Sequence, residues 1–375
     1  MAAAIYLIGY VPPALKLGEC RTVQAVVKDR YVYLNRDRYC NLTHSGGLDV
    51  AAFEGTALGA RMRSFADSAT SGSIKVATHA FTFWSSGVLS LARETLPGAD
   101  GPAPPAADYT YVVEVHDSKA PATVQIATEF SSPKEAVDCH KSPKSPLAYV
   151  LGLIYRTNGQ LAGQFANSAT CPTEPWLQLP GTFLPNRFDT QVELLPGDYD
   201  VRVVVSDGQN IGQARVPLHV EPFDGQRLMI SGLVLGGVVR DASWILREAA
   251  EVSPAPIVPS PLVSNKVEFF PATDTHFPKS DHLPLYFEIY EPQRVDQNIA
   301  VSFHVRVVDL KSGSVVMNME RINAADWIQP GHVVIPVGMK LPTDKLKKGS
   351  YRLEVQASDS AGRESEWREA TFTLQ

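Results

Sequence analysis

Two stretches of the sequence share one pattern of apolar and polar positions. Residues 194–208 read LLPGDYDVRVVVSDG, and residues 347–362 read KKGSYRLEVQASDSAG. In each stretch a Gly turn is followed by a tyrosine, Tyr199 or Tyr351, and then by apolar residues at every second position. An alternation with a period of two is typical of a β-strand with one buried face. The sequence therefore predicts the same strand twice.

A second repeated element precedes each of these strands. Residues 149–165 and 301–319 both predict two alternating strands around a glycine turn, at Gly159 and at Gly313. Because both elements recur in the same order and at similar spacing, we expect two related domains. The predicted fold class is mainly all-β, with two tandem immunoglobulin/fibronectin-like β-sandwich domains preceded by a short β-hairpin remnant and a helix.

Composition shifts along the chain predict the domain boundaries. The strand that begins at Leu228 is expected to complete the first sandwich, and Asp241 is expected to cap a short helix. Alternate prolines after this helix favour an extended spacer. The predicted parts are a strand and hairpin remnant (1–45), a helical connector (46–72), the first sandwich (73–238), a short helix with a Pro-rich linker (239–262) and the second sandwich (263–375).

The repeated tyrosine predicts a structural feature of sandwich folds. A tyrosine just after a turn, at the start of a long strand, can direct its hydroxyl to the backbone a few residues upstream, which is the tyrosine corner. Tyr199 and Tyr351 both have this position, so we expect a structural role for both. A catalytic tyrosine is the less favoured alternative, because both copies fit the corner.

Charge and cysteine content narrow the class of protein. The 375 residues carry 34 Lys and Arg against 40 Asp and Glu, a net charge of -6, which argues against a nucleic-acid-binding protein. The longest apolar run is too short to span a membrane.

Four cysteines fall in two local pairs, which favours two disulfides in an oxidising compartment. Four reduced, buried thiols are the alternative. They are Cys20, Cys40, Cys139 and Cys171.

The search for chemical sites gives few candidates. Asp274, His276, Asp281 and His282 gather in ATDTHFPKSDH and could bind a divalent metal, although a solvated loop is the favoured interpretation because no fixed ligand spacing is present. Two loop-borne tryptophans, Trp176 and Trp327, are candidates for a binding face, with capping of the sandwich cores as the favoured alternative. No catalytic motif, phosphate-binding loop or dinucleotide fingerprint occurs, so neither a catalytic residue nor a cofactor is predicted.

The segment from Ile5 to Cys40 resembles the closing part of the von Willebrand factor A-like (VWFA) domain in bacterial VWFA-related proteins. Later strands resemble the β-rich tail of that family. The family's metal site uses a D-x-S-x-S loop, which this sequence lacks, so metal-dependent adhesion is not implied. The resemblance implies an exported, cell-envelope protein of which this chain is a downstream part. The matching residues are Tyr6, Leu7, Gly9, Tyr10, Pro12, Arg38 and Tyr39, followed by 147–165, 194–220 and 228–237.

Together these patterns predict a non-enzymatic, extracellular or periplasmic protein that acts in protein binding, adhesion or scaffold assembly. Its partner would be a protein or a glycan, and no nucleic-acid or membrane-spanning role is expected. One alternative is an accessory region of a secreted hydrolase. The other is a structural subunit that associates with itself through strand edges.

Overall fold

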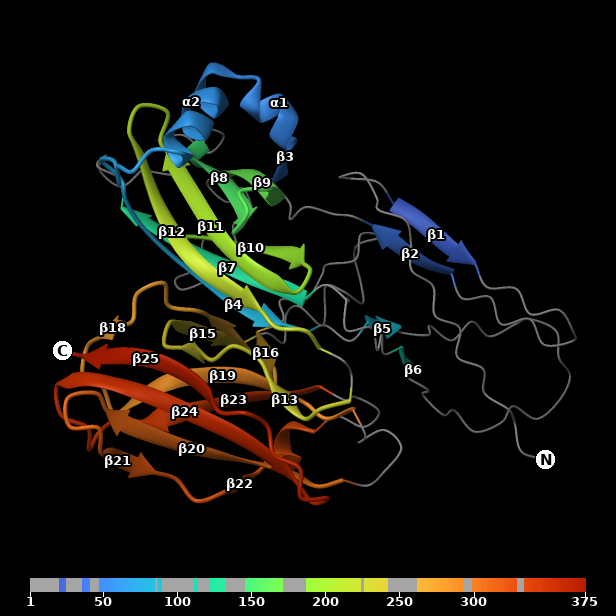
Figure 1. Ribbon diagram of the computed structural model, residues 1–375, viewed down its shortest axis with the longest axis vertical. Helices are drawn as coiled ribbons and strands as arrows, with labels where there is room; N and C mark the ends of the chain where they lie inside the picture. The colour runs from blue at the N-terminus through green and yellow to red at the C-terminus, as the bar shows by residue number, and fades with distance from the viewer. Residues whose placement is uncertain are drawn as a thin grey trace, which may run out of the picture.

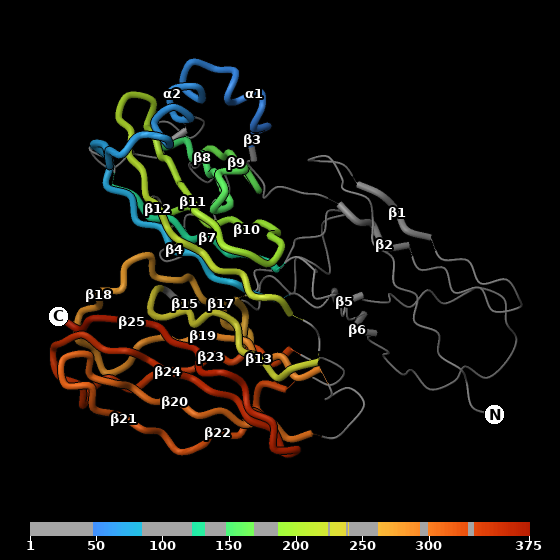
Figure 2. Tube along the Cα trace, in the orientation of Figure 1, coloured from blue at the N-terminus to red at the C-terminus, as the bar shows by residue number. Residues whose placement is uncertain are grey.

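The computed structural model is built mainly of antiparallel strands, arranged as two β-sandwiches (Figure 1). Figure 2 follows the same course along the chain. The mainly-β sandwich fold class predicted from the sequence is therefore confirmed. The structure describes residues 20–24, 36–40, 47–84, 87–89, 111–113, 122–131, 146–170, 187–223, 226–241, 262–292, 299–328 and 334–375.

The first sandwich has a three-stranded sheet facing a larger one. The smaller sheet has the order β10-β7-β4, with β4 at Lys75–Phe83, β7 at Ala122–Ser131 and β10 at Arg187–Leu194. The larger sheet has the order β12-β11-β8-β9-β3, with β3 at Gly47–Leu48, β8 at Pro146–Arg156, β9 at Leu161–Thr170, β11 at Gly197–Ser206 and β12 at Ile211–Val220. All neighbouring strands in both sheets are antiparallel.

The core of this sandwich follows from the alternation seen in the sequence. Strand β11 turns Tyr199, Val201, Val203 and Val205 toward the smaller sheet, and all four are buried. A fully buried valine contributes about 1.5–3 kcal/mol relative to an exposed one. This strand is therefore a main source of the free energy that holds the two sheets together.

Two helices cover the outer face of the larger sheet (Figure 1). Helix α1 (Val50–Glu54) begins after Asp49, whose Oδ1 accepts a hydrogen bond from the Ala52 N–H at 2.8 Å. Helix α2 (Ala57–Ala66) begins after Thr56, which accepts from the Gly59 N–H at 3.0 Å. Such capping residues satisfy N–H groups that the first helical turn leaves unpaired. The predicted helical connector thus packs on the first sandwich.

The second sandwich repeats the arrangement. In one sheet, β19 (His282–Tyr290) pairs with β23 (Val334–Pro342) on one side and with β13 (Met229–Ile230) and β14 (Val234–Leu235) on the other. The other sheet has the order β18-β25-β24-β20-β21, with β22 (Ile322–Asn323) also on β20 and a 3₁₀ turn, η3, at Ala324–Trp327. Its strands are β18 (His276–Phe277), β20 (Val301–Asp309), β21 (Val315–Asn318), β24 (Gly349–Asp359) and β25 (Arg368–Leu374).

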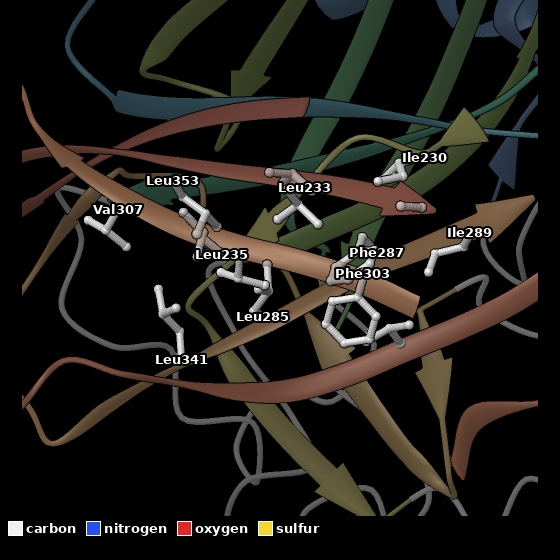
Figure 3. Packing of buried hydrophobic residues seen from close by; sticks show 14 of the residues in the cluster. Ile230, Leu233, Leu235, Leu285, Phe287, Ile289, Phe303, Val307, Leu341 and Leu353 are labelled. Carbon is white, nitrogen blue, oxygen red and sulfur yellow. The ribbon is translucent and has the colours of Figure 1, made fainter. Parts of the chain in front are cut away.

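Apolar side chains from both sheets interdigitate in the second core (Figure 3). Phe287 of β19 meets Phe303 of β20 edge to face, with ring centroids 5.3 Å apart. Leu285 and Leu353 lie in the same cluster, both fully buried. Aromatic pairs of this geometry contribute about 0.5–1.5 kcal/mol beyond the area they bury.

The segment after Leu228 departs from the sequence-based prediction. It was expected to complete the first sandwich, but β13 and β14 pair with β19 of the second. The physical reason is that Ile230, Leu233 and Leu235 fill the second core, whereas Met229 faces the first. An apolar segment can be buried in the core of either sandwich, so its pairing with a distant strand decides to which sheet it belongs.

A small third sheet is inserted before β18, with the order β15-β17-β16. Its strands are β15 (Val238–Asp241), β16 (Val263–Ser264) and β17 (Val267–Phe270). Residues 239–241 of the predicted linker therefore belong to a strand, and Asp241 ends that strand. The short helix and the Pro-rich segment predicted to follow, at 242–261, lie outside the described residues.

The two sandwiches meet through aromatic and charged side chains. Phe81 and Phe83 of β4 share a buried cluster with Phe269 and Tyr286 from the second half of the chain. Arg368 of β25 donates to both carboxylate oxygens of Glu221, each at 2.6 Å. Such bidentate, charge-assisted pairs fix orientation as well as adding stability.

Two isolated ribbons complete the described residues. Strand β1 (Cys20–Gln24) pairs with β2 (Arg36–Cys40), and β5 (Gly87–Leu89) pairs with β6 (Tyr111–Val113). The first ribbon falls within the strand and hairpin remnant predicted at 1–45. In its register Cys20 lies directly opposite Cys40.

Candidate functional site

A surface pocket of about 250 Å³ opens at one end of the first sandwich. Three chain segments meet there: the turn from β8 to β9, the end of β10 and the start of β11. The turn is shaped by Gly159, whose φ of 82° lies in the left-handed region that glycine adopts without strain. The lining residues are Arg156, Gln160, Leu161, Ala162, Glu193, Leu194, Leu195 and Tyr199.

The tyrosine corner forms the inner wall of this pocket. The Tyr199 hydroxyl donates a hydrogen bond to the carbonyl oxygen of Leu195 at 2.5 Å. The Arg156 guanidinium also lines the pocket and lies over the Tyr199 ring, 5.2 Å from its centroid. Cation–π contacts of this kind contribute about 0.5–1 kcal/mol at exposed sites. The corner therefore holds both the backbone at Leu195 and the Arg156 side chain in place.

The rim of the pocket is apolar and exposed. Leu161 is 36% exposed and Leu195 is 49% exposed, whereas the neighbouring Leu194 is 2% exposed and belongs to the core. Two consecutive leucines at the end of a strand cannot both face the core, because side chains alternate between the two faces. One leucine therefore points outward beside the pocket.

Two charged side chains flank these leucines. Arg156 is half-buried and Glu193 is exposed. Within the described part of the chain, neither has an oppositely charged partner at ion-pair distance. A pocket with an apolar rim and single charges of both signs can hold an apolar side chain and orient a charged neighbour beside it.

The second tyrosine has the same geometry as the first. The Tyr351 hydroxyl donates to the carbonyl oxygen of Lys347 at 2.7 Å, again four residues upstream. Its ring packs against Phe372, with centroids 5.4 Å apart. Both hydroxyls therefore make the bond that defines a tyrosine corner, and this bond accounts for the repeated motif.

The residues considered for a metal site are only partly brought together. Asp274 Oδ1 accepts from the His276 N–H at 3.0 Å and lies 2.6 Å from its Nδ1, with both side chains exposed. The hydrogen bond from the His276 side chain lowers the pKa of Asp274. Across the residues that the structure describes, no three His, Cys, Asp or Glu side chains form a group that could hold a metal ion. Asp281 and His282, at the start of β19, thus do not complete a ligand set.

Trp327 lies at the edge of the second core. Its Nε1 donates to the carbonyl oxygen of Gly338 at 3.2 Å, and its ring meets Phe303 edge to face at 5.7 Å. The half-buried ring packs against the core cluster. These contacts agree with the capping alternative rather than with a free binding aromatic. Trp176, Cys139 and Cys171 lie outside the described residues.

A buried carboxyl group lies between the two sandwiches. Glu288 of β19 accepts hydrogen bonds from the hydroxyls of Tyr286, at 2.9 Å, and Tyr290. Tyr290 in turn accepts from the backbone N–H of Trp84, at 3.0 Å, so the cluster spans both sandwiches. Burial raises the pKa of Glu288 to about 7, although both tyrosine hydrogen bonds lower it. None of the residues that line the pocket belongs to this cluster. We assign the cluster a structural role, because its hydrogen bonds join the two sandwiches.

The sequence did not identify the pocket, although it contained a signal for it. The doubled leucine of LLPGDY and the leucine that follows the Asn-Gly turn of RTNGQL both break the rule that apolar side chains face the core. The meeting of these two positions depends on the pairing of β8 with both β9 and β11.

Comparisons with known proteins give no family. No family model and no curated protein matches the chain. Among solved structures, fibronectin(III)-like modules of Clostridium thermocellum CbhA match with 14% identity and a TM-score of 0.17, over 68% of this chain and 85% of that one. A Bifidobacterium dentium beta-glucuronidase complexed with coumarin-3-O-glucuronide matches with 12% identity and a TM-score of 0.22, over 82% and 49%. At these TM-scores neither likeness carries an argument about function.

Proposed function

We propose that this chain is a non-enzymatic binding protein, in which the pocket beside Tyr199 receives an apolar side chain of a protein partner. The observation that carries the proposal is the pair of exposed leucines, Leu161 and Leu195, on the rim of a hollow whose wall is fixed by the tyrosine corner. Exposed apolar groups beside a preformed hollow are typical of interaction sites.

The chemistry of the pocket favours binding over catalysis. Its polar groups are one guanidinium, one carboxylate and one amide, and its only hydroxyl, on Tyr199, donates to the backbone. This set contains no nucleophile beside a base, which acyl or glycosyl transfer would need. We therefore favour a binding protein over a hydrolase, and an accessory region of a secreted hydrolase is the alternative that the same pocket permits.

The place of action rests on the VWFA resemblance. We propose an extracellular or cell-envelope location on that basis, with protein binding, adhesion or scaffold assembly as the role. None of the helices that the structure describes is long and apolar enough to cross a membrane.

The pocket can be tested with an array of short peptides that present one apolar residue between acidic or basic neighbours. Leu161 is 36% exposed and Leu195 is 49% exposed, so covering both contributes about 2 kcal/mol, or about thirtyfold in affinity. We expect peptides that bind the native chain to bind the double variant Leu161→Asp and Leu195→Asp about thirtyfold more weakly. Val239→Asp is the matched control, because Val239 is 42% exposed but lies on β15.

Leu195 holds the tyrosine corner through its backbone carbonyl, so changing its side chain preserves that hydrogen bond. Melting curves of each variant check that the fold is retained. Binding that is unchanged in the double variant, or lost equally in Val239→Asp, would show that the pocket is not the binding site.

A further inference from the structure

The contact surface between the two sandwiches is mainly apolar. The odd-numbered side chains of β19 fill the second core, whereas Tyr286, Glu288 and Tyr290 alternate to the opposite side and face the first sandwich. Phe81 and Phe83 of β4 belong to the same buried cluster as Tyr286. Figure 1 shows β4 on the side of the first sandwich that faces the second. Glu288 therefore places a carboxyl group on a mainly apolar surface.

Two backbone amides make their hydrogen bonds across this surface. The Trp84 N–H donates to the Tyr290 hydroxyl at 3.0 Å, and the Gly232 N–H donates to the Thr82 carbonyl oxygen at 3.1 Å. Within the described residues the chain passes from one sandwich to the other once, at residues 220–229. Contacts across the surface, rather than repeated chain crossings, therefore hold the sandwiches together, and these two amides report whether the surface is closed.

Glu288 differs from two other buried carboxyl groups of the second sandwich. Glu291 pairs with Arg363, and Glu354 pairs with Arg352, each at 2.7 Å. The carboxyl group of Glu288 accepts instead from two tyrosine hydroxyls, and no described cation lies at ion-pair distance from it. An arginine keeps a buried carboxylate charged, whereas neutral hydroxyls compensate that charge only in part. The charge on Glu288 therefore depends on pH.

The groups nearest to Glu288 keep their own charge state. Burial raises the pKa of Tyr286 and of Tyr290 well above the ordinary value of 10.0, so both hydroxyls retain their protons. Arg368 of β25 is the cation that acts on Tyr290, but it donates to both oxygens of Glu221. The hydrogen bond from Arg368 lowers the pKa of Glu221, so this pair stays charged at neutral pH.

The other strands packed around Glu288 add no cation against it. The β13–β14 segment contributes the Ser231 hydroxyl, which accepts from the Glu288 N–H at 2.9 Å. Glu268 lies on the side of β17 that faces away from β19, and Lys340 of β23 is exposed near the start of β19. On β4, burial lowers the pKa of His79. Protonation of His79 disfavours closure as pH falls, which is the opposite sign to an ionising carboxyl group.

We propose that the proton on Glu288 keeps the two sandwiches packed against each other, and that its loss lets them separate along the surface between β4 and β19. With Glu288 ionised, the closed form holds a buried carboxylate without a cation, whereas separation hydrates the charge. Separation also exposes Phe81 and Phe83 of β4. The proposal is independent of the binding role given to the pocket, because no residue of this cluster lines the pocket.

The direction and size of the effect follow from the two states of Glu288. Burial raises the pKa of Glu288 to about 7 in the closed form, and hydration returns it to the ordinary 4.5 in the open form. The closed form thus binds the proton more tightly, and closure weakens as pH rises from 4.5 to 7. The ratio of open to closed molecules should rise about 300-fold in all, and about 70-fold between about pH 5 and about pH 8.

The test is amide hydrogen exchange of the full chain, read by NMR at about pH 5 and about pH 8 and expressed as protection relative to the free-peptide rate. Amides of the central strands β11 and β24 report complete unfolding. We expect the Trp84 and Gly232 amides to be less protected than those amides at both pH values. We also expect their protection to fall about 70-fold between about pH 5 and about pH 8.

The variant Glu288→Gln separates the carboxyl group from other effects of pH. Its amide does not titrate, so at about pH 8 the Trp84 and Gly232 amides should be at least about tenfold better protected in the variant than in the native chain. At about pH 5 they should be no better protected. Glu320→Gln, which removes an exposed carboxyl group of the same sandwich, should match the native chain at both pH values. The contribution of His79 is common to all three proteins and cancels.

Two results would overturn the proposal. If the Trp84 and Gly232 amides are as well protected as the amides of β11 and β24, the sandwiches separate only when the whole chain unfolds. If these two amides are less protected but their protection does not change with pH, the motion that exposes them leaves Glu288 buried. The pH series on the native chain gives both results without any variant, so the test does not depend on the folding of Glu288→Gln.

Discussion

Removing the buried carboxyl group of Glu288 should change how the stability of this protein depends on pH. Burial raises the pKa of Glu288 to about 7 in the folded protein, from an ordinary value of 4.5. Below pH 4.5 the group is protonated in both the folded and the unfolded chain. Between pH 4.5 and 7 the unfolded chain ionises while the folded protein keeps the proton, so the free energy of unfolding falls as pH rises.

The size of this effect follows from the two pKa values. The difference of 7 minus 4.5 corresponds to about 3 kcal/mol, all of it lost by the time the pH exceeds 7. Glu288→Gln does not titrate and so lacks this dependence. Its amide cannot accept from both Tyr286 and Tyr290, which costs about 1 kcal/mol at every pH. We expect the variant to be less stable than the native protein at pH 4 and more stable at pH 8.

Urea unfolding at a series of pH values from about 4 to about 8 measures this difference, and other titrating groups cancel between the two proteins. Glu320→Gln is the matched control, because it removes an exposed carboxyl group of the same sandwich without touching the interface. Parallel stability curves for Glu288→Gln and the native protein would refute the reasoning. So would a carboxyl ¹³C titration that places the pKa of Glu288 below about 5.

Four further substitutions test the packing. Tyr199→Phe and Tyr351→Phe should each lower the free energy of unfolding by about 1 kcal/mol, the net value of the corner hydrogen bond, and unchanged denaturation midpoints in both would count against that bond. Arg368→Met should lower the free energy of unfolding by about 1–3 kcal/mol, because it breaks the bidentate pair with Glu221 between the sandwiches. We expect faster proteolysis between the two sandwiches in this variant. Equal rates of proteolysis in the variant and the native protein would contradict the role given to this pair. Gly152→Ala should cost about 1–3 kcal/mol, because its Cβ would lie 2.0 Å from the Phe165 ring, and a neutral urea midpoint would disprove the close contact.

The repeated features of the fold could be predicted from the sequence because they are local. A strand that alternates with a period of two, and that follows a glycine turn and a tyrosine, specifies its own buried face. Strands β11 and β24 bury the alternating apolar residues that the pattern indicates. The hairpin turns at Gly159 and Gly313 depend likewise on residues close in sequence.

The pairing of the Leu228 segment could not be predicted in this way. Its side chains contribute to both cores, and only the distant strand β19 decides its sheet. The pocket has the same origin, because Arg156, Leu161 and Leu195 come together only when three strands are paired. Periodicity assigns each residue to a face, but it carries no information about which strand ends meet.

The position of β13 and β14 also limits where recombination could divide the gene for this protein without damaging either sandwich. The first strands of the second sandwich precede the inserted sheet β15-β17-β16, so a break in the gene within 242–261 would strip β19 of a partner edge. An exchange that keeps both halves whole must fall between Val220, where β12 ends, and Met229. Recombination at the proline-rich stretch, the point that composition alone would suggest, would produce a second half unable to fold as it does here.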